Sequence, residues 1–252
     1  MQTTGEGNAR TYDIVLPAYN EGTIIESTLR EFYQAVSLNK NHRIRFIVCE
    51  DGSTDNTVAV LQRLALDLPI FLIQGSKRKG YSRAVLDGFH AATAEVVGFI
   101  DSDGQCDPKD FEALLGALAL EKDLVVGFRD PRSDHWIRLL MSRSFCFVYK
   151  RLFPVRLKDP SCPYLLIRRT LLSKILASTP SAILREGFWW EFFARALALG
   201  AQWEEVPVAH RVRSGGQTQV YRPTKVPKIA YTHLKGLWAL KRELSNLAPG
   251  DA

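Results

Sequence analysis

The sequence has no apolar run long enough to cross a membrane. Its most apolar stretches, 111–120 and 187–199, are interrupted by Glu112, Glu191 and Arg195, and both fall short of the roughly 20 residues that a spanning helix needs. The first ten residues are polar and contain no apolar core, so we expect neither a signal peptide nor an anchor there. The sequence therefore predicts a cytoplasmic chain that contacts a membrane, if at all, from its cytoplasmic face.

Cysteine is scarce and has no ligand or disulfide pattern. The four cysteines stand singly, without the paired spacing of a zinc site or a disulfide framework. We expect reduced thiols that pack in the interior. No histidine has ligand spacing, and the sequence contains no internal repeat or low-complexity tract. These absences exclude a zinc module, a disulfide-stapled scaffold and a repeat protein.

Composition allows a full hydrophobic core and indicates anionic partners. With 252 residues and 46% hydrophobic content, the chain can form one α/β domain. A formal net charge of +6 favours polyanions, which include nucleic acid, anionic lipid headgroups and phosphorylated small molecules. No other feature of the chain supports nucleic-acid binding, so we expect no nucleic acid among its partners.

Short apolar runs alternate with segments of helical spacing, which predicts a parallel sheet flanked by helices. The expected strands are 12–17, 45–49, 70–73, 96–100, 123–129, 164–167 and 203–208. The expected helices are 24–36, 57–66, 83–92, 110–120, 169–178, 186–199 and one from 226 onward. We therefore expect a frayed N-terminus over 1–10, one domain over 11–222, and an amphipathic helix with a tail over 223–252.

Two carboxylates one residue apart follow the apolar run 96–100. Asp101 and Asp103 stand where a strand of a parallel sheet delivers side chains to the ligand-binding edge. Carboxylates this close repel one another, so a divalent cation between them would stabilise the pair. The plainer interpretation is a solvated acidic turn. Loops rich in Asp, Asn, Ser or Gly also follow the strands at 12–17 and 45–49, and parallel strands would bring them to the same edge.

Four segments in order resemble a known signature: Pro17-Ala18-Tyr19-Asn20-Glu21, Glu50-Asp51-Gly52-Ser53-Thr54-Asp55, Lys79-Gly80-Tyr81-Ser82 and Asp101-Ser102-Asp103-Gly104-Gln105. They resemble the family 2 glycosyltransferases of the GT-A fold, and within them the polyprenol-phosphate sugar synthases. The resemblance covers about residues 13 to 218. It implies a Rossmann-like, mixed but mostly parallel sheet, a nucleoside diphosphate sugar as donor, a divalent metal, and inversion at the anomeric carbon.

The resemblance assigns the donor side residue by residue. It implies that Pro17, Ala18, Tyr19 and Glu21 hold the base and ribose, that Asp51 reads the base beside Ser53, and that Lys79 and Gly80 lie near the ribose and diphosphate. Asp101 and Ser102 would contact the donor. The metal, Mg²⁺ or Mn²⁺, would be held by Asp101, Asp103 and Gln105, all oxygen ligands as these ions prefer.

The acceptor of this branch is a polyprenyl phosphate, whose nucleophile is already ionised and needs no base. The site needs positive charge to hold two anions together, and arginine bonds phosphate oxygens with two parallel donors. The resemblance places Arg129, Arg138 with Ser142, and Arg213 in this role, with Asp103 and Glu191 completing the expected catalytic set.

The sequence also departs from the family pattern. Gln217 and Thr218 stand where relatives often have Ser-Lys, and the Gln-X-X-Arg-Trp element of processive synthases is absent, which argues against chain synthesis. Glu191 stands where enzymes with hydroxyl acceptors place their base, so it could be that base or could orient an arginine. Transfer to a hydroxyl is thus the alternative function. A nucleotide-sugar binding module without turnover is the third.

The segment from 226 onward predicts a basic amphipathic helix. Its apolar stripe includes Leu234, Leu237 and Trp238, and lysines and arginines populate the remaining positions. A stripe of this kind could pack on its own domain, on a twin subunit of a homo-oligomer, or on a membrane surface. The sequence leaves these three open.

Overall fold

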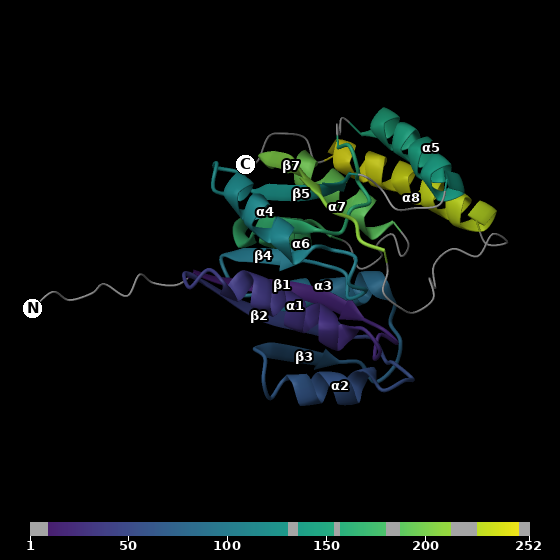
Figure 1. Cartoon of the computed structure of the whole chain (residues 1–252). Helices are drawn as coiled ribbons and strands as arrows, with labels where there is room; N and C mark the ends of the chain where they lie inside the picture. The colour runs from purple at the N-terminus through teal and green to yellow at the C-terminus, as the bar shows by residue number, and fades with distance from the viewer. Residues whose placement is uncertain (1–9, 131–135, 154–156, 180–186, 213–225, 247–252) are drawn as a thin grey trace, which may run out of the picture.

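In the described part of the chain, a seven-stranded sheet runs through the molecule (Figure 1). The computed structural model describes residues 10–130, 136–153, 157–179, 187–212 and 226–246, without the side chains of 136–142, 226–230 and 246. The strands are β1 (Arg10–Ala18), β2 (His42–Glu50), β3 (Ile70–Gln74), β4 (Val96–Phe99), β5 (Leu124–Arg129), β6 (Leu165–Arg168) and β7 (Trp203–Val208).

The strand order is β3-β2-β1-β4-β6-β5-β7. Strand β6 runs antiparallel to β4 and β5, and every other pair in the sheet is parallel. The expected mixed, mostly parallel sheet in one domain is confirmed. Because β1 to β4 all run the same way, the loops that follow them emerge at one edge of the sheet.

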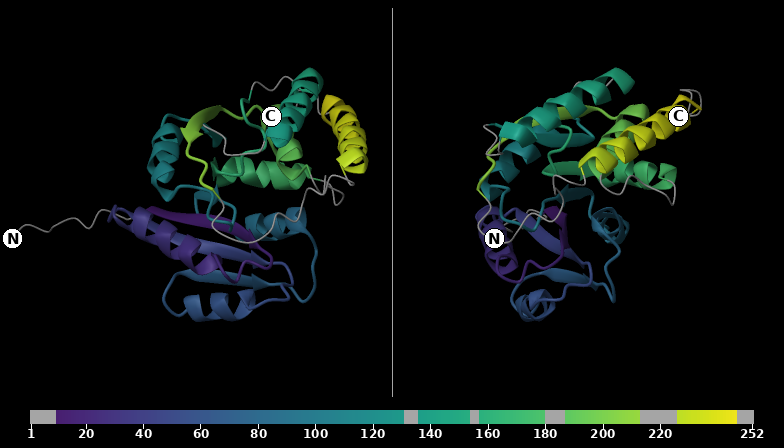
Figure 2. Two further views of the ribbon diagram at one scale, coloured as in Figure 1. Left: turned by 45° about the vertical axis from the view of Figure 1, so that its right-hand side comes forward. Right: turned by 90° about the vertical axis from the view of Figure 1, so that its right-hand side faces the viewer.

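Helices cover both faces of the sheet (Figures 1 and 2). The described helices are α1 (Ile25–Ser37), α2 (Thr57–Leu64), α3 (Tyr81–Ala91), the 3₁₀ turn η1 (Pro108–Asp110), α4 (Phe111–Leu118), α5 (Trp136–Leu152), α6 (Arg169–Ser178), α7 (Phe188–Ala198) and α8 (Val226–Asn246). The core side chains of α1, α2 and α4 form one apolar cluster with the sheet. Those of α3, α6 and α7 form a second cluster on the other face, which also takes in residues of α5 and α8.

Several element boundaries differ from the sequence expectation, and three of the differences have a clear local cause. Strand β1 starts at Arg10, inside the segment expected to fray, because its amide donates to the carbonyl of Asn41 at 2.9 Å. Helix α3 starts two residues early, since Gly80 has φ 98° and its carbonyl accepts the first helical amides. The helix expected from residue 110 is preceded by η1, which Asp107 caps by accepting from the amide of Lys109 at 3.0 Å.

All four cysteines are free thiols, as expected. Burial raises the pKa of Cys49 and of Cys162 to about 12, so both remain protonated at neutral pH and act as packing groups.

Helix α8 packs on its own domain. Leu237 and Leu240 are buried in the cluster that contains α7, and Glu243 bonds the guanidinium of Arg195 on α7 at 2.8 and 3.0 Å. Its own domain is therefore one surface on which this helix packs, among the three that the sequence left open. Within the described ranges, no helix is both long and apolar enough to span a bilayer.

Candidate active site

The loops after β1 and β2 are joined to each other at the carboxyl edge of the sheet. The amide of Asn20 donates to Ser53 Oγ at 3.0 Å, and the amide of Thr54 donates back to Asn20 Oδ1 at 2.8 Å. The amide of Asp51 donates to the carbonyl of Ala18 at 2.9 Å. The amide of Glu21 donates to Thr57 Oγ1. The structure therefore brings together the first two segments of the sequence signature, which include Pro17 and Glu21.

Asp51 fixes the basic loop 77–80, which precedes α3. Its carboxylate is 3% exposed and accepts from the amides of Lys79 at 2.6 Å and Gly80 at 2.8 Å. Gly52 has φ 71°, and a β-carbon there would lie 2.6 Å from the backbone carbon of Lys77. The close approach of the two loops thus requires glycine. The role expected of Asp51, reading the base, stays a prediction.

The basic loop presents its side chains next to Tyr19. The guanidinium of Arg78 lies 4.0 Å from the centroid of the Tyr19 ring, a cation–π contact. Lys79 pairs with Asp87 on α3 through its ammonium group. Arg78 was not singled out from the sequence, where it was one member of a basic run. Only the structure shows that Arg78 contacts the Tyr19 ring.

Two aromatic side chains, Tyr81 and Trp189, are connected by hydrogen bonds to the acidic turn 101–105 that follows β4. The hydroxyl of Tyr81 donates to Asp101 Oδ1 at 2.9 Å and accepts from Trp189 Nε1 at 2.9 Å. Burial, followed by the charge of Asp101, raises the pKa of Tyr81 well above its usual value, so the hydroxyl keeps its proton. Ser102 is buried, and its carbonyl accepts from Thr28 on α1 at 3.4 Å.

The segment after β7 closes onto the same turn. Gln105 Nε2 donates to the carbonyl of Arg211 at 3.1 Å, and the amide of Arg211 donates to the carbonyl of Gln105 at 3.0 Å. Cys106 and His210 form an isolated antiparallel bridge beside them, and Arg211 also pairs with Asp107 at 2.8 Å. In the sequence, residues 210–213 show only a basic character. No spacing signal links them to a turn that lies about a hundred residues earlier.

The residues expected to hold a metal offer suitable oxygens. Asp101, Asp103 and Gln105 stand on one turn, and Asp103 Oδ1 accepts from the amide of Gln105 at 3.1 Å, which orients that carboxylate. Among the described residues, no three Asp, Glu, His or Cys side chains gather into a protein-only metal site. Two carboxylates with substrate phosphates are the usual set for Mg²⁺ and suit Mn²⁺ as well, so the residues fit the expected ion.

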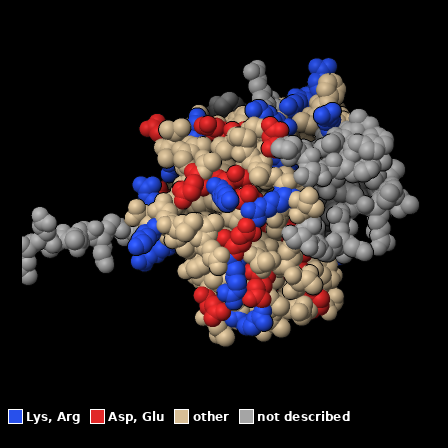
Figure 3. Space-filling model, viewed as in Figure 1, with Lys and Arg blue, Asp and Glu red and all other residues tan. Residues whose placement is uncertain are grey.

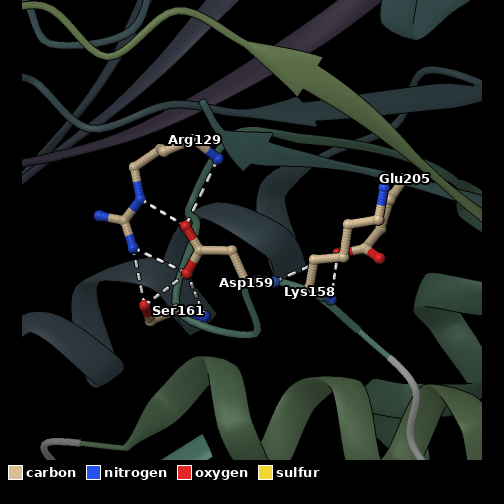
Figure 4. A network of polar contacts seen from close by, with 5 residues as sticks. All are labelled: Arg129, Lys158, Asp159, Ser161 and Glu205. Carbon is tan, nitrogen blue, oxygen red and sulfur yellow. Dashed lines mark hydrogen bonds and ion pairs between the residues drawn. The ribbon is translucent and has the colours of Figure 1, made fainter. Parts of the chain in front are cut away.

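Arg129, expected to bind acceptor phosphate, lies in a buried ion pair at the end of β5 (Figure 4). Its Nε and Nη2 donate to the two oxygens of Asp159 at 2.6 and 2.9 Å, and Nη2 also donates to Ser161 Oγ at 2.7 Å. The side chains of Arg129 and Asp159 are 8% and 6% exposed. Glu205 on β7 accepts from the amide of Lys158, the residue before Asp159, at 2.7 Å.

Glu191 is also buried and paired. Its Oε1 accepts from Nε and Nη2 of Arg195 at 2.9 and 2.8 Å. Arg195 is 1% exposed and further bonds the carbonyl of Ser178 and the carboxylate of Glu243. Trp189, two residues before Glu191, faces Tyr81, and two helical residues turn a side chain by about 200°. This arrangement favours the interpretation in which Glu191 orients an arginine.

The other residues expected to bind the acceptor phosphate lie outside the described side chains. Arg138 and Ser142 lie four residues apart on α5 and so share a helix face, but their side chains fall outside the described residues. Arg213 falls outside them entirely. Their roles stay predictions.

Residues 13–176 match the sequence pattern of Glycosyl transferase family 2. The chain belongs to this family. The match begins within β1 and contains β2 to β6, the acidic turn, Arg129 and the Asp159 turn, so most of the site described above lies within the matched residues.

Curated relatives of this family 2 chain act on polyprenyl phosphates according to their names. The chain is 27% identical over 224 residues to the undecaprenyl-phosphate 4-deoxy-4-formamido-L-arabinose transferase of Pseudomonas fluorescens, covering 86% of this chain and 62% of that one. It is 28% identical over 187 residues to the dodecaprenyl-phosphate galacturonate synthase of Rhizobium johnstonii, covering 69% of this chain and 55% of that one. The chain thus spans roughly half to two thirds of the curated relatives it matches.

Solved structures share the fold of this family 2 chain. Glucosyl-3-phosphoglycerate synthase from Mycobacterium tuberculosis, in complex with Mn²⁺, UDP-glucose and phosphoglyceric acid, aligns with TM-score 0.66 and 21% identity, covering 96% of this chain and 84% of that one. A mannosyltransferase from Pyrobaculum calidifontis, with GDP-mannose and Mn²⁺, aligns with TM-score 0.58 and 19% identity over 96% and 76%.

Proposed function

We propose that this chain is an inverting glycosyltransferase that moves a hexose from a UDP- or GDP-linked sugar to a polyprenyl phosphate, with Mg²⁺ or Mn²⁺. The observation that carries the proposal is the meeting of the acidic turn 101–105 with the Asp51–Lys79–Gly80 loop at the carboxyl edge of the sheet. The names of the curated relatives support a polyprenyl phosphate as acceptor.

Each residue expected in the site has a proposed task. Asp51 keeps the amides of Lys79 and Gly80 in place beside the donor, and Tyr19 with Glu21 bounds the nucleotide end. Asp101, Asp103 and Gln105 would hold the ion. When bound, the ion offsets the charge that develops on the departing nucleoside diphosphate. Arg138 with Ser142 and Arg213 would hold the acceptor phosphate, which attacks without the help of a base. Arg129 was expected to share this task, but its Nε and Nη2 are engaged by Asp159 and Ser161, so its part in phosphate binding stays a prediction.

The proposal is tested first by donor binding. We expect titration calorimetry with Mn²⁺ present to show binding of a UDP or GDP sugar, and transfer of labelled sugar to a short polyprenyl phosphate to follow. Asp103→Asn should lower transfer by about 100-fold or more, since charge neutralisation by the ion is lost with its ligand. An absence of affinity for every UDP and GDP sugar would refute the proposal.

Glu191→Gln separates the lipid-phosphate acceptor from a hydroxyl acceptor. Transfer to an ionised phosphate should survive this change, whereas a base-dependent enzyme should lose about 100-fold or more. Glu243→Gln is the matched control, because it weakens the other carboxylate contact of the same Arg195. Equal, small losses in the two variants support the proposal. A large loss of transfer activity in Glu191→Gln alone would instead support a hydroxyl acceptor.

A further inference from the structure

The three residues after β7, which we call the 209–211 segment, lie along the acidic turn and the residues that follow it. The amide of Ala209 donates to Asp110 Oδ2 at 2.8 Å. The amide of Arg211 donates to the carbonyl of Gln105 at 3.0 Å. The segment is therefore attached at both of its ends to the part of the chain that carries the expected metal ligands.

The side chain of Arg211 connects this segment to two further groups. Its Nη1 donates to Glu31 Oε1 on α1 at 2.7 Å, and its Nη2 pairs with Asp107 Oδ1 at 2.8 Å. Asp107 also caps η1, so its carboxylate is held from both sides. Because the two carboxylates together outweigh the single positive charge of Arg211, this guanidinium is poorly suited to bind a phosphate group of a ligand.

The surface around α1 carries charges of both signs. On the face seen in Figure 3, which carries α1 and α2, acidic and basic side chains lie next to one another. A large patch of positive charge would attract phosphorylated ligands, whereas interspersed charges of opposite sign largely cancel. The surroundings of Arg211 therefore favour a role in holding neighbouring elements together over a role in capturing an anion.

The 209–211 segment also determines how the side-chain amide of Gln105 is oriented. Gln105 Nε2 donates to the carbonyl of Arg211 at 3.1 Å. Since a carbonyl oxygen can only accept, the nitrogen end of the amide must face it. The planar amide then sets the direction of Oε1, which is the end that Mg²⁺ or Mn²⁺ could bind, because these ions take oxygen ligands. One residue thus holds both the main chain and the side chain of Gln105.

We propose that Arg211 is a positioning residue for the metal turn and acts through Gln105. Its guanidinium fixes the 209–211 segment to Glu31 and Asp107, and the carbonyl of Arg211 fixes the Gln105 amide with its oxygen available to an ion. The inference rests on the proposed function, in which the acidic turn holds the ion. The resemblance gave Arg211 no task.

Mn²⁺ affinity in the presence of UDP or GDP tests the proposal, with free Mn²⁺ measured by electron paramagnetic resonance. Removing a group that orients a metal ligand commonly weakens metal binding about tenfold to 100-fold. Arg211 lies one contact further from the ion, so we expect Arg211→Ala to raise the Kd for Mn²⁺ about three- to tenfold. Arg211→Lys keeps the charge without the two-pronged geometry and should recover part of the loss.

A double-variant cycle shows whether Arg211 acts through Gln105. Gln105→Ala should weaken Mn²⁺ binding about tenfold or more, because it removes the oriented oxygen. The double variant should then bind Mn²⁺ no more weakly than Gln105→Ala alone, since the effects of residues that act through one another are not additive.

Arg30→Ala is the matched control. Arg30 lies on α1 and also bonds two carboxylates, those of Glu26 and Asp67, away from the acidic turn. Its removal should leave the Kd for Mn²⁺ unchanged. A purely structural contribution of Arg211 would lower the stability of the chain in the same way as Arg30 does, without changing the metal affinity of the folded protein.

The side-chain amide of Gln105 supplies a second measurement that needs no metal. Its two protons can be identified by nuclear magnetic resonance, because their signals disappear in Gln105→Ala. In the unmodified chain they should exchange slowly with water, since Nε2 donates to the carbonyl of Arg211. In Arg211→Ala they should exchange about threefold faster or more, because the segment that accepts the hydrogen bond opens more often.

Three results would overturn the inference while leaving the proposed function standing. They are an unchanged Mn²⁺ affinity in Arg211→Ala, additive losses in the double variant, and equal exchange of the Gln105 amide protons in the unmodified chain and Arg211→Ala. In each of these cases the unmodified chain still binds Mn²⁺ with a nucleotide. If the unmodified chain binds no Mn²⁺ with UDP or with GDP, the proposed function is refuted and the inference is refuted with it.

Discussion

Tyr81 holds the first carboxylate of the acidic turn from another part of the chain. Asp101 belongs to the turn after β4, Tyr81 opens α3, and Trp189 lies on α7, so one hydroxyl connects three elements. Tyr81 belongs to the segment 79–82 that resembles the family signature, but the resemblance placed only Lys79 and Gly80 near the donor. Groups that orient a metal-binding or ligand-binding carboxylate are often as important as the carboxylate itself.

Tyr81→Phe should weaken Mn²⁺ binding in the presence of UDP by about tenfold to 100-fold, because Asp101 loses the donor that fixes its orientation. Titration calorimetry measures the effect. Tyr33→Phe on α1 is the control for loss of a tyrosine hydroxyl outside the site. Trp189→Phe leaves the Tyr81 bond to Asp101 available and should have a smaller effect. A Tyr81→Phe protein that binds Mn²⁺ like the unmodified chain contradicts a positioning role.

At the scale of elements, a buried carboxylate connects β1, β2 and the entry to β4. Asp13 on β1 is 1% exposed and accepts from Nε and Nη2 of Arg45 on β2 at 2.8 Å each. The amides of Thr93 and Ala94, just before β4, donate to it at 2.7 and 2.8 Å. Burial alone would raise the pKa of Asp13, but the Arg45 and backbone hydrogen bonds outweigh it, and the pKa lies below its usual value.

Asp13→Asn should lower the free energy of unfolding at pH 7 by about 3 kcal/mol, since it leaves Arg45 without its charge partner and replaces one of the two acceptor oxygens by a donor NH₂ group among donors. Because the folded pKa is depressed, the stabilisation by Asp13 is complete above its unfolded pKa of about 4 and disappears as pH falls through the folded value. Urea unfolding should therefore show the gap between the two proteins narrowing below about pH 4. A gap that is constant with pH would contradict the assignment.

At the scale of the whole molecule, the two halves of the chain are joined at the candidate site itself. Strands β1 to β4 with α1 to α3 supply the loops proposed to bind the donor, while Trp189 and the 210–211 segment reach them from the second half. A ligand bound at this edge would contact loops from both halves. Its binding should therefore stabilise the entire fold rather than one loop.

UDP with Mn²⁺ should raise the melting temperature. A ligand at 100 times its dissociation constant adds about 2.7 kcal/mol to the free energy of unfolding, which corresponds to roughly 5–10 °C for a chain of this size. Differential scanning calorimetry should show the shift with Mn²⁺ and its loss after EDTA is added. The shift should also be absent in Asp103→Asn. Equal stabilisation by UDP with and without metal would argue against a metal-assisted donor site.

The fold class could be predicted from the sequence alone, and so could the segments that meet at the candidate site. Apolar periodicity sufficed for the alternation of strands and helices, because that signal is local. Ordered motifs singled out Asp51, Lys79, Asp101 and Asp103 for donor binding, a role that stays a prediction. The expectation failed where a boundary depended on a distant partner. Arg10 joined β1 because Asn41 was there to accept its amide.

Only the tertiary structure decided how the side chains are used. The sequence singled out Arg129 and Glu191 for catalysis, but could not show that Asp159 pairs with Arg129 across 30 residues, or that Glu243 shares Arg195 with Glu191 from 48 residues away. It also gave α8 a single apolar stripe, which folding divided into a buried side and an outward aromatic and basic side. Hydrogen bonds and ion pairs between distant residues depend on three-dimensional proximity, and hydrophobic periodicity does not encode which partner a polar group meets.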